Sequence, residues 1–276
     1  MPASNRDRPL NIGFEVYRPV RPLADKARGE NIFWHSLIHA GCLDRWDDPL
    51  HELQRARGRD QTIWGLHFDL ETRALSWELR VLSPGLAQFR STLAGAAELA
   101  PGVEDEPKGT AIVALRFDTK SERTIPGLDF HVRSNEDPRR FEVRRVSRDA
   151  TEILGRDLLR EPKREIDLVL PAVKASSAVD FGAHPRLLGR VMIPELYACR
   201  RLHISKRPGR DALCFSGVNI EQLIFAYKRF ELPAELLSFL TTHQAKLEHL
   251  LYDVSIEYLE REGRIHYPSF AVFGCL

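Results

Sequence analysis

Residues 128–133 read Leu-Asp-Phe-His-Val-Arg, and this stretch decides how the rest of the chain is interpreted. Apolar residues alternate strictly with an aspartate, a histidine and an arginine. Successive side chains of a β-strand point to opposite faces, so the pattern predicts a strand with one apolar and one polar face. An acid, an imidazole and a guanidinium in a row suit a phosphorylated ligand. The alternative is an ordinary solvated face.

The same two-faced pattern recurs in pairs and predicts five β-hairpins. The predicted arms are residues 62–70 with 75–81, 111–118 with 128–133, 153–159 with 166–170, 201–205 with 213–218, and 252–258 with 265–273. The arm at residues 153–159 fits a helix nearly as well as a strand.

Helical patterns fill the segments between the hairpins. They cover residues 31–40, 50–57, 85–99, 137–146, 185–197, 219–230 and 233–248. Asn219 and Gln222 have the spacing of a capping box. Hairpins alternating with amphipathic helices predict an α+β fold in which the apolar strand faces pack under the helices.

The polar strand faces must then meet either solvent, in an open sheet, or the lumen of a closed barrel. About ten strands would enclose a wide cavity. The polar residues that would line it are His67, Asp69, Glu78, Arg80, Arg116, Asp118, Asp129, His131, Arg133, Asp167, Arg201, His203, Asp253 and Glu257. We expect one domain over residues 1–276, with residues 1–25 as an extended lead-in.

Composition excludes several classes of function. The 276 residues are 43% hydrophobic and 29% charged, which is typical of a globular protein. The formal net charge of +1 gives no case for binding nucleic acid or an anionic membrane. The four cysteines form no CxxC pair, which argues against a zinc site or a disulfide framework. With no apolar signal segment near Met1, we expect a cytoplasmic protein, monomeric or weakly dimeric.

A resemblance to a known family is spread along most of the chain. It rests on the segments 14–16 (Phe-Glu-Val), 117–120 (Phe-Asp-Thr-Lys), 128–133, 153–157 (Ile-Leu-Gly-Arg-Asp), 202–206 (Leu-His-Ile-Ser-Lys) and 264–266 (Arg-Ile-His). In these segments the chain resembles the ABBA prenyltransferases, and more narrowly the cyanobactin-type enzymes that prenylate macrocyclic ribosomal peptides. The resemblance implies a ten-stranded antiparallel β-barrel surrounded by α-helices, built from repeated hairpin–helix units. It also implies that residues 153–159 form a strand.

The resemblance further implies a dimethylallyl or geranyl diphosphate donor that brings Mg²⁺ with it. Arginine and histidine side chains in a water-poor lumen would stabilise the leaving diphosphate. The candidate diphosphate-binding residues are Arg80, Arg116, His131, Arg133 and His203. No dense carboxylate cluster in the sequence calls for a protein-bound metal.

The implied acceptor is a cyclic or short peptide, and its nucleophile must lose a proton. The candidate catalytic residues for that step are His67, Asp69 and Glu78. Gly65 stands where tyrosine-modifying relatives are expected to carry a carboxylate, which puts tyrosine in doubt and favours a cationic acceptor such as arginine. A prenyltransferase of small aromatic molecules and a non-catalytic barrel that binds a phosphorylated or amphipathic ligand are the alternatives.

Overall fold

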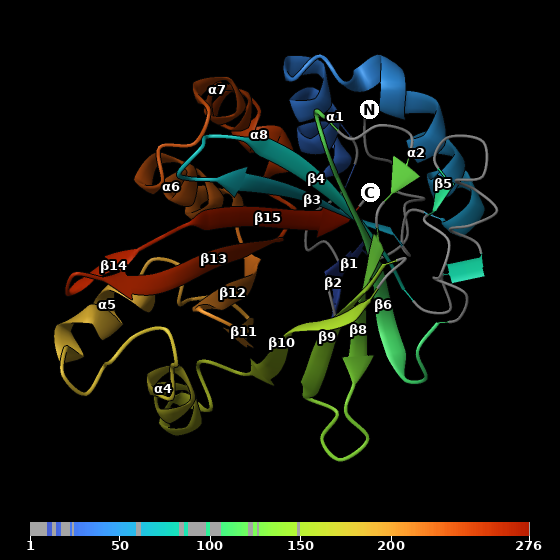
Figure 1. The fold of residues 1–276 in the computed structure, drawn as a ribbon. Helices are drawn as coiled ribbons and strands as arrows, with labels where there is room; N and C mark the ends of the chain where they lie inside the picture. The colour runs from blue at the N-terminus through green and yellow to red at the C-terminus, as the bar shows by residue number, and fades with distance from the viewer. Residues whose placement is uncertain are drawn as a thin grey trace.

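The structure is a computed structural model, and it describes residues 10–12, 15–17, 23, 25–58, 62–82, 86–87, 98–99, 106–120, 124–125, 127–147 and 150–275. Ten antiparallel strands follow one another in the order β12-β11-β10-β9-β8-β6-β4-β3-β15-β13. The last of them, β13, pairs back with β12 and closes the sheet into a barrel (Figure 1). The predicted α+β barrel with surrounding helices is therefore confirmed.

The barrel strands are short and regular. They are β3 (Thr62–Asp69), β4 (Leu75–Leu82), β6 (Thr110–Asp118), β8 (Gly127–Arg133), β9 (Arg140–Ser147), β10 (Thr151–Arg160), β11 (Arg201–Arg207), β12 (Arg210–Val218), β13 (Tyr252–Arg261) and β15 (Ser269–Cys275). The short strand β14 (Arg264–His266) pairs with the end of β13. Two further pairs lie outside the barrel: β1 (Leu10–Ile12) with β2 (Glu15–Tyr17), and β5 (Glu98–Leu99) with β7 (Thr124–Ile125).

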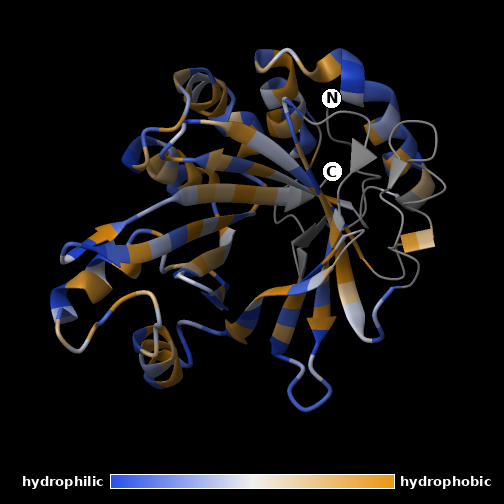
Figure 2. Ribbon diagram, viewed as in Figure 1, coloured by the Kyte–Doolittle hydropathy of each residue, from blue (hydrophilic) through white to orange (hydrophobic). Residues whose placement is uncertain are grey.

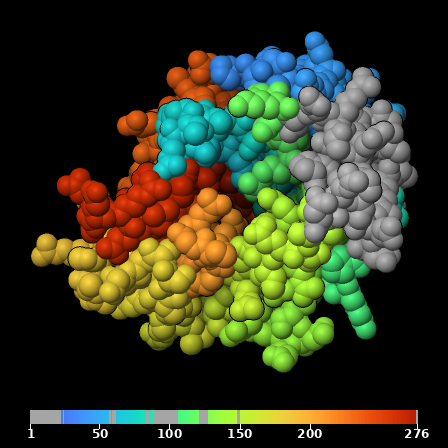
Figure 3. Space-filling view, in the orientation of Figure 1, coloured from blue at the N-terminus to red at the C-terminus, as the bar shows by residue number. Residues whose placement is uncertain are grey.

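Seven α-helices lie in the described part of the chain. They are α1 (Glu30–His39), α2 (Leu43–Arg57), α4 (Ile166–Lys174), α5 (Leu188–Val191), α6 (Ile220–Arg229), α7 (Ala234–Thr242) and α8 (Gln244–Leu247). Helices α1, α2 and α6 to α8 lie together along one side of the barrel, whereas α4 and α5 lie on another (Figure 1). Figure 3 shows the gold segment that contains α4 and α5 against the red β13–β14 hairpin.

The apolar core lies between the barrel wall and the helices. Trp64 and Trp77 are fully buried on the outer faces of β3 and β4. The indole Nε1 of Trp77 donates a hydrogen bond of 2.8 Å to Ser36 of α1, and Trp46 of α2 packs against Phe117. The strands are striped with hydrophobic and hydrophilic residues (Figure 2), as two-faced strands require.

Two of the predicted elements are wrong in this part of the fold. Residues 137–146 were expected to be helical, but β9 starts at Arg140 and alternates buried Phe141 and Val143 with charged neighbours. Residues 166–170 begin helix α4 instead of returning as a strand, so β10 pairs with β9 and β11. Asp167 therefore belongs to α4, and its assignment to the lumen was wrong. The strand at residues 153–159 is confirmed.

Other predicted boundaries are corrected by smaller amounts. Helix α2 begins at Leu43, seven residues before the prediction, and contains Pro49. The predicted helix over residues 185–197 is reduced to one turn of 3₁₀ helix, Pro185–Leu187, and α5. Most of the helix expected over residues 85–99 lies outside the described residues, and its end is strand β5. Most of residues 1–25 also lie outside them.

Candidate active site in the barrel lumen

The strand register directs the polar faces of most barrel strands inward. Residues opposite each other in an antiparallel pair share a face of the sheet. Glu78 on β4 lies between Gly65 on β3 and Arg116 on β6. Further round the ring, Asp129 on β8 pairs with Arg145 on β9. The lumen is thus lined by charged side chains, as the sequence predicted.

Glu78 is the centre of the first lumen cluster, which we call the Glu78 cluster and which comprises Glu78, His67, Arg80 and Arg116. Its carboxylate is 2% exposed. One oxygen, Oε2, lies 2.8 Å from Nε2 of His67 and 2.9 Å from a guanidinium nitrogen of Arg116, while Oε1 accepts from Nε of Arg80. Burial alone would raise the pKa of Glu78, but Arg80, His67 and Arg116 together hold it well below its usual value. The carboxylate is therefore ionised at neutral pH.

An aromatic ring lies directly beside this charged cluster. The guanidinium carbon of Arg80 is 3.8 Å from the centre of the Phe273 ring, a cation–π contact in a desolvated site. The same ring fills the space beside Gly65, because a Cβ atom at Gly65 would lie 2.6 Å from Phe273. The glycine therefore allows Phe273 to sit beneath Arg80.

A second group of polar side chains, the Asp157 cluster, lies on β8, β10 and β11. It comprises Asp157, His131, His203 and Ser205. The hydroxyl of Ser205 donates to Oδ1 of Asp157, and Nδ1 of His131 lies 3.9 Å from Oδ2. Burial lowers the pKa of both His131 and His203 to about 4, with the positive charge of Arg80 acting in the same direction. Both imidazoles are therefore neutral at pH 7.

Ion pairs also line the end of the lumen that lies near the β3–β4 and β9–β10 turns. Two guanidinium nitrogens of Arg145 bind the two carboxylate oxygens of Asp129, at 2.7 and 2.9 Å. They border a cavity of about 370 Å³ that also contacts Arg116 and Asp118. Arg116 lines this cavity and also belongs to the Glu78 cluster, so the two are adjacent.

The structure brings six of the eight predicted site residues into the lumen: His67, Glu78, Arg80, Arg116, His131 and His203. The other two lie at the ends of their strands. Asp69 accepts hydrogen bonds from the backbone N–H groups of Glu71 and Thr72 in the β3–β4 turn. Arg133 is exposed at the opposite end of the barrel, 5.5 Å from the ring of Phe141.

Sequence reasoning missed three residues that line the lumen. Arg145 was assigned to a helix, Asp157 lay in an arm with an ambiguous pattern, and Phe273 was not assigned to a face. Alternation could not place Phe273, because both faces of β15 are apolar, with Ala271 and Phe273 on one and Phe270 and Val272 on the other.

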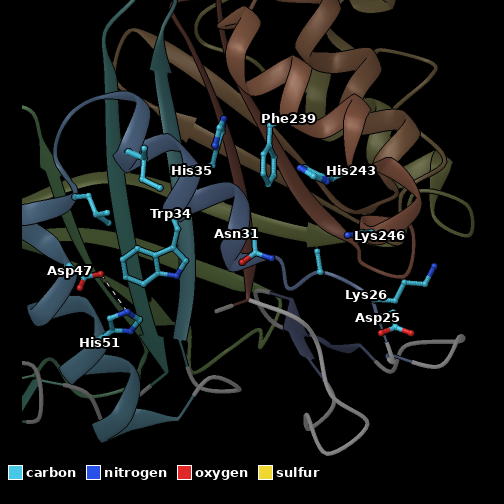
Figure 4. A pocket seen from close by; sticks show the side chains of 13 residues that line it. Asp25, Lys26, Asn31, Trp34, His35, Asp47, His51, Phe239, His243 and Lys246 are labelled. Atoms are coloured by element: carbon cyan, nitrogen blue, oxygen red, sulfur yellow. Dashed lines mark ion pairs between the residues drawn. The ribbon is translucent and has the colours of Figure 1, made fainter.

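A larger cavity, of about 600 Å³, lies outside the barrel between α1, α2, α7 and α8 (Figure 4). Its walls are ring stacks: Trp34 on His51, and His35 on Phe239. It contains no carboxylate cluster, and the described residues of the chain include no group of three or more His, Cys, Asp or Glu that could hold a metal ion.

Comparison of the sequence with protein-family models and with curated proteins finds no match in either set. No helix in the described part of the chain is both long enough and apolar enough to cross a membrane.

Proposed function

We propose that this protein transfers a prenyl group from a prenyl diphosphate to a side chain of a peptide inside the barrel lumen. The observation that carries the proposal is the contact of Arg80 with both Glu78 and Phe273. It combines a guanidinium for the diphosphate, an aromatic face for an allylic cation and a carboxylate for a proton in one buried site. The closed barrel with surrounding helices supports the resemblance to ABBA prenyltransferases.

The chemistry follows from these neighbours. The C–O bond of the donor breaks, and its electron pair leaves with the diphosphate. Arg80 and Arg116 donate to the developing negative charge, while the face of Phe273 stabilises the allylic cation. The acceptor nucleophile then forms the new bond to carbon, and Glu78 takes its proton. Because Arg80 and Arg116 would turn from Glu78 toward the diphosphate, the carboxylate would lose positive neighbours and become a stronger base.

We propose arginine as the acceptor side chain. Several carboxylates of the lumen face are buried or nearly so, including Asp129, Asp253 and Glu257. These carboxylates already bind guanidinium groups, as Asp129 binds Arg145, so they favour a guanidinium acceptor over a phenol. Phe273 fills the position beside Gly65 where a first-strand carboxylate would otherwise activate tyrosine.

In this proposal Mg²⁺ is bound only by the diphosphate of the donor. The described residues offer no three-ligand set for it. The oxygens of the diphosphate and water would hold Mg²⁺, and none of the steps above depends on a protein-bound metal.

The test is to incubate the purified protein with dimethylallyl or geranyl diphosphate, Mg²⁺ and matched cyclic peptides that contain arginine, tyrosine or neither. Mass spectrometry should show one prenyl increment on the arginine peptide. Tight donor binding without any product would favour the non-catalytic barrel, and prenylation of small phenols alone would favour the small-molecule enzyme. Prenylation of the tyrosine peptide only would overturn arginine as the acceptor.

The variant that tests the role of Arg80 is Arg80→Met. A second variant, Glu78→Gln/Arg80→Met, leaves no unpaired buried charge. Both should lose transfer and weaken donor binding. Arg186→Met, which removes an exposed arginine on the outside, is the control and should retain activity.

A further inference from the structure

The outer face of β9 and β10 is exposed, in contrast with the rest of the barrel wall. Outer residues such as Trp64, Leu79 and Leu115 are fully buried. On β10, by contrast, the Arg156 side chain is 75% exposed and Ile153 is 47% exposed. Strands β8 and β9 are joined directly by a turn, and no described helix follows either strand to cover this face.

A groove of about 730 Å³ lies over this exposed face, bounded by α4 and by the β8–β9 turn. We call it the β9–β10 groove. Its apolar lining comes from Val132, Leu158, Ile204 and, on α4, Ala172. Leu168 lies one helical turn before Ala172 and is 51% exposed, so it lengthens the apolar strip along α4.

Positive charge dominates the rest of the lining. Six cationic residues line the groove against three acidic ones: Lys108, Arg133, Arg140, Arg144, Arg156 and Lys206 against Glu136, Glu142 and Asp157. Glu142 forms ion pairs with two of these cations, Arg144 at 2.5 Å and Arg156 at 3.7 Å. The groove therefore carries an excess of positive charge along an apolar strip.

We propose that the β9–β10 groove binds an acidic amphipathic helix of a partner protein. Such a helix would lie over β9 and β10 as the chain's own helices lie over other strands. Its apolar side would cover the partly exposed Leu158 and Ala172, and its acidic flanks would meet Arg144 and Arg156. A nucleic acid would satisfy the arginines but would leave the aliphatic strip without an apolar partner. The inference is independent of the chemistry in the lumen.

The test uses a fluorescein-labelled 18-residue synthetic peptide with leucine at helical i, i+3, i+4 and i+7 spacing and glutamate on the flanks. Fluorescence anisotropy with the full-length protein should show saturable binding. A scrambled peptide of the same composition and a single-stranded oligonucleotide should bind at least tenfold more weakly. Equal binding of the scrambled peptide, or tighter binding of the oligonucleotide, would overturn the proposal.

Two sets of variants locate the binding surface. Arg144→Glu/Arg156→Glu should weaken peptide binding at least tenfold, and Leu168→Ser should weaken it severalfold, because the first reverses the charge of the groove and the second shortens its apolar strip. Arg186→Glu/Lys228→Glu makes the same change of charge at exposed positions outside the groove and should have no effect. An equal loss in both double variants would mean that net charge alone drives binding, and the helix proposal would fail. Thermal melts of all variants would test whether each is folded.

Discussion

The carboxylate of Glu78 binds two arginines and a histidine at once, so a change at this one residue affects the whole Glu78 cluster. Glutamine has the same shape as glutamate but cannot hold the two guanidinium groups by charge or accept the acceptor's proton. The residue is therefore the most informative single position in the lumen.

We predict that Glu78→Gln reduces the turnover rate of prenyl transfer by about 10² or more, the usual range for loss of a general base. Donor binding, measured by calorimetry, should change much less than turnover, because Arg80 and Arg116 remain. Glu71→Gln is the matched control, since Glu71 forms its ion pairs with Arg261 and His266 at the surface. A Glu78→Gln protein with unchanged turnover would remove Glu78 from the mechanism.

A second prediction concerns Gly65, which lies against the Phe273 ring. A methyl group at this position would lie 2.6 Å from the Phe273 ring, so the ring must move away from Arg80. Gly65→Ala should lower the free energy of unfolding by about 1–3 kcal/mol, as overpacking of a filled site does. In urea titrations Gly189→Ala should have almost no effect, because nothing lies within 4 Å of the added Cβ. Equal stability of the two variants would show that Phe273 relaxes freely.

Helix α6 shows how one element is fixed by its first residues. The Asn219 side chain accepts from the N–H of Gln222, and the Gln222 side chain accepts from the N–H of Asn219. We predict that Asn219→Ala lowers the free energy of unfolding by about 1 kcal/mol, because the backbone N–H of Gln222 loses its side-chain acceptor. Asn219→Asp keeps the acceptor oxygen and should behave like the wild type in the same titration. A loss in the aspartate variant as large as in alanine would argue against the cap.

Strands in which apolar and polar residues alternate could be predicted from the sequence. Strands in which this alternation is interrupted or masked could not. Strands β3, β4 and β8 alternate cleanly because their outer faces pack under apolar surface. Strand β9 presents arginine and glutamate on its outer face, so its period-two signal is masked by charge. Strand β10 has an irregular register between Ile153 and Gly155, which shifts the alternation by one residue and gives the arm its helical appearance.

The candidate site residues could likewise be predicted only on strands with a regular alternation. His67, Glu78 and Arg80 were found because they lie on strands with a regular alternation. Asp157 lies just beyond the irregularity of β10, and Arg145 lies on β9, so neither could be assigned to the lumen. The local pattern of β10 fitted a strand and a helix almost equally, and the family resemblance favoured the strand.

At the scale of the whole molecule, three buried neutral histidines couple the stability of the barrel to pH. The pKa values of His67, His131 and His203 are lowered to about 4, chiefly by burial. In the unfolded chain an imidazole titrates near 6.5. Between these two values the unfolded chain binds protons that the folded chain does not, so stability is full above about pH 6.5 and falls as the pH drops toward 4.

We therefore predict that the free energy of unfolding, from urea titration, is lower at pH 5 than at pH 7.5 by about 2 kcal/mol for each of the three histidines. His203→Gln should reduce this difference by roughly one third, because one proton fewer is taken up on unfolding. Replacing the exposed His184 with glutamine should leave the difference unchanged. Equal stability at the two pH values would mean that the lumen histidines are protonated in the folded protein.

Closure of the barrel depends on the pairing of β15 with β3, in which Ser269 lies opposite Asp69, 200 positions earlier in the chain. Deleting residues 269–276 would expose the edges of β3 and β13, and we predict that this variant aggregates and melts without a cooperative transition. Size-exclusion chromatography and circular dichroism test this, and a monomer that melts cooperatively would contradict it. During synthesis on the ribosome, β3 must therefore wait for about 200 further residues before its second edge is protected. The barrel should consequently fold slowly and late, and chaperones that shield strand edges should increase its yield.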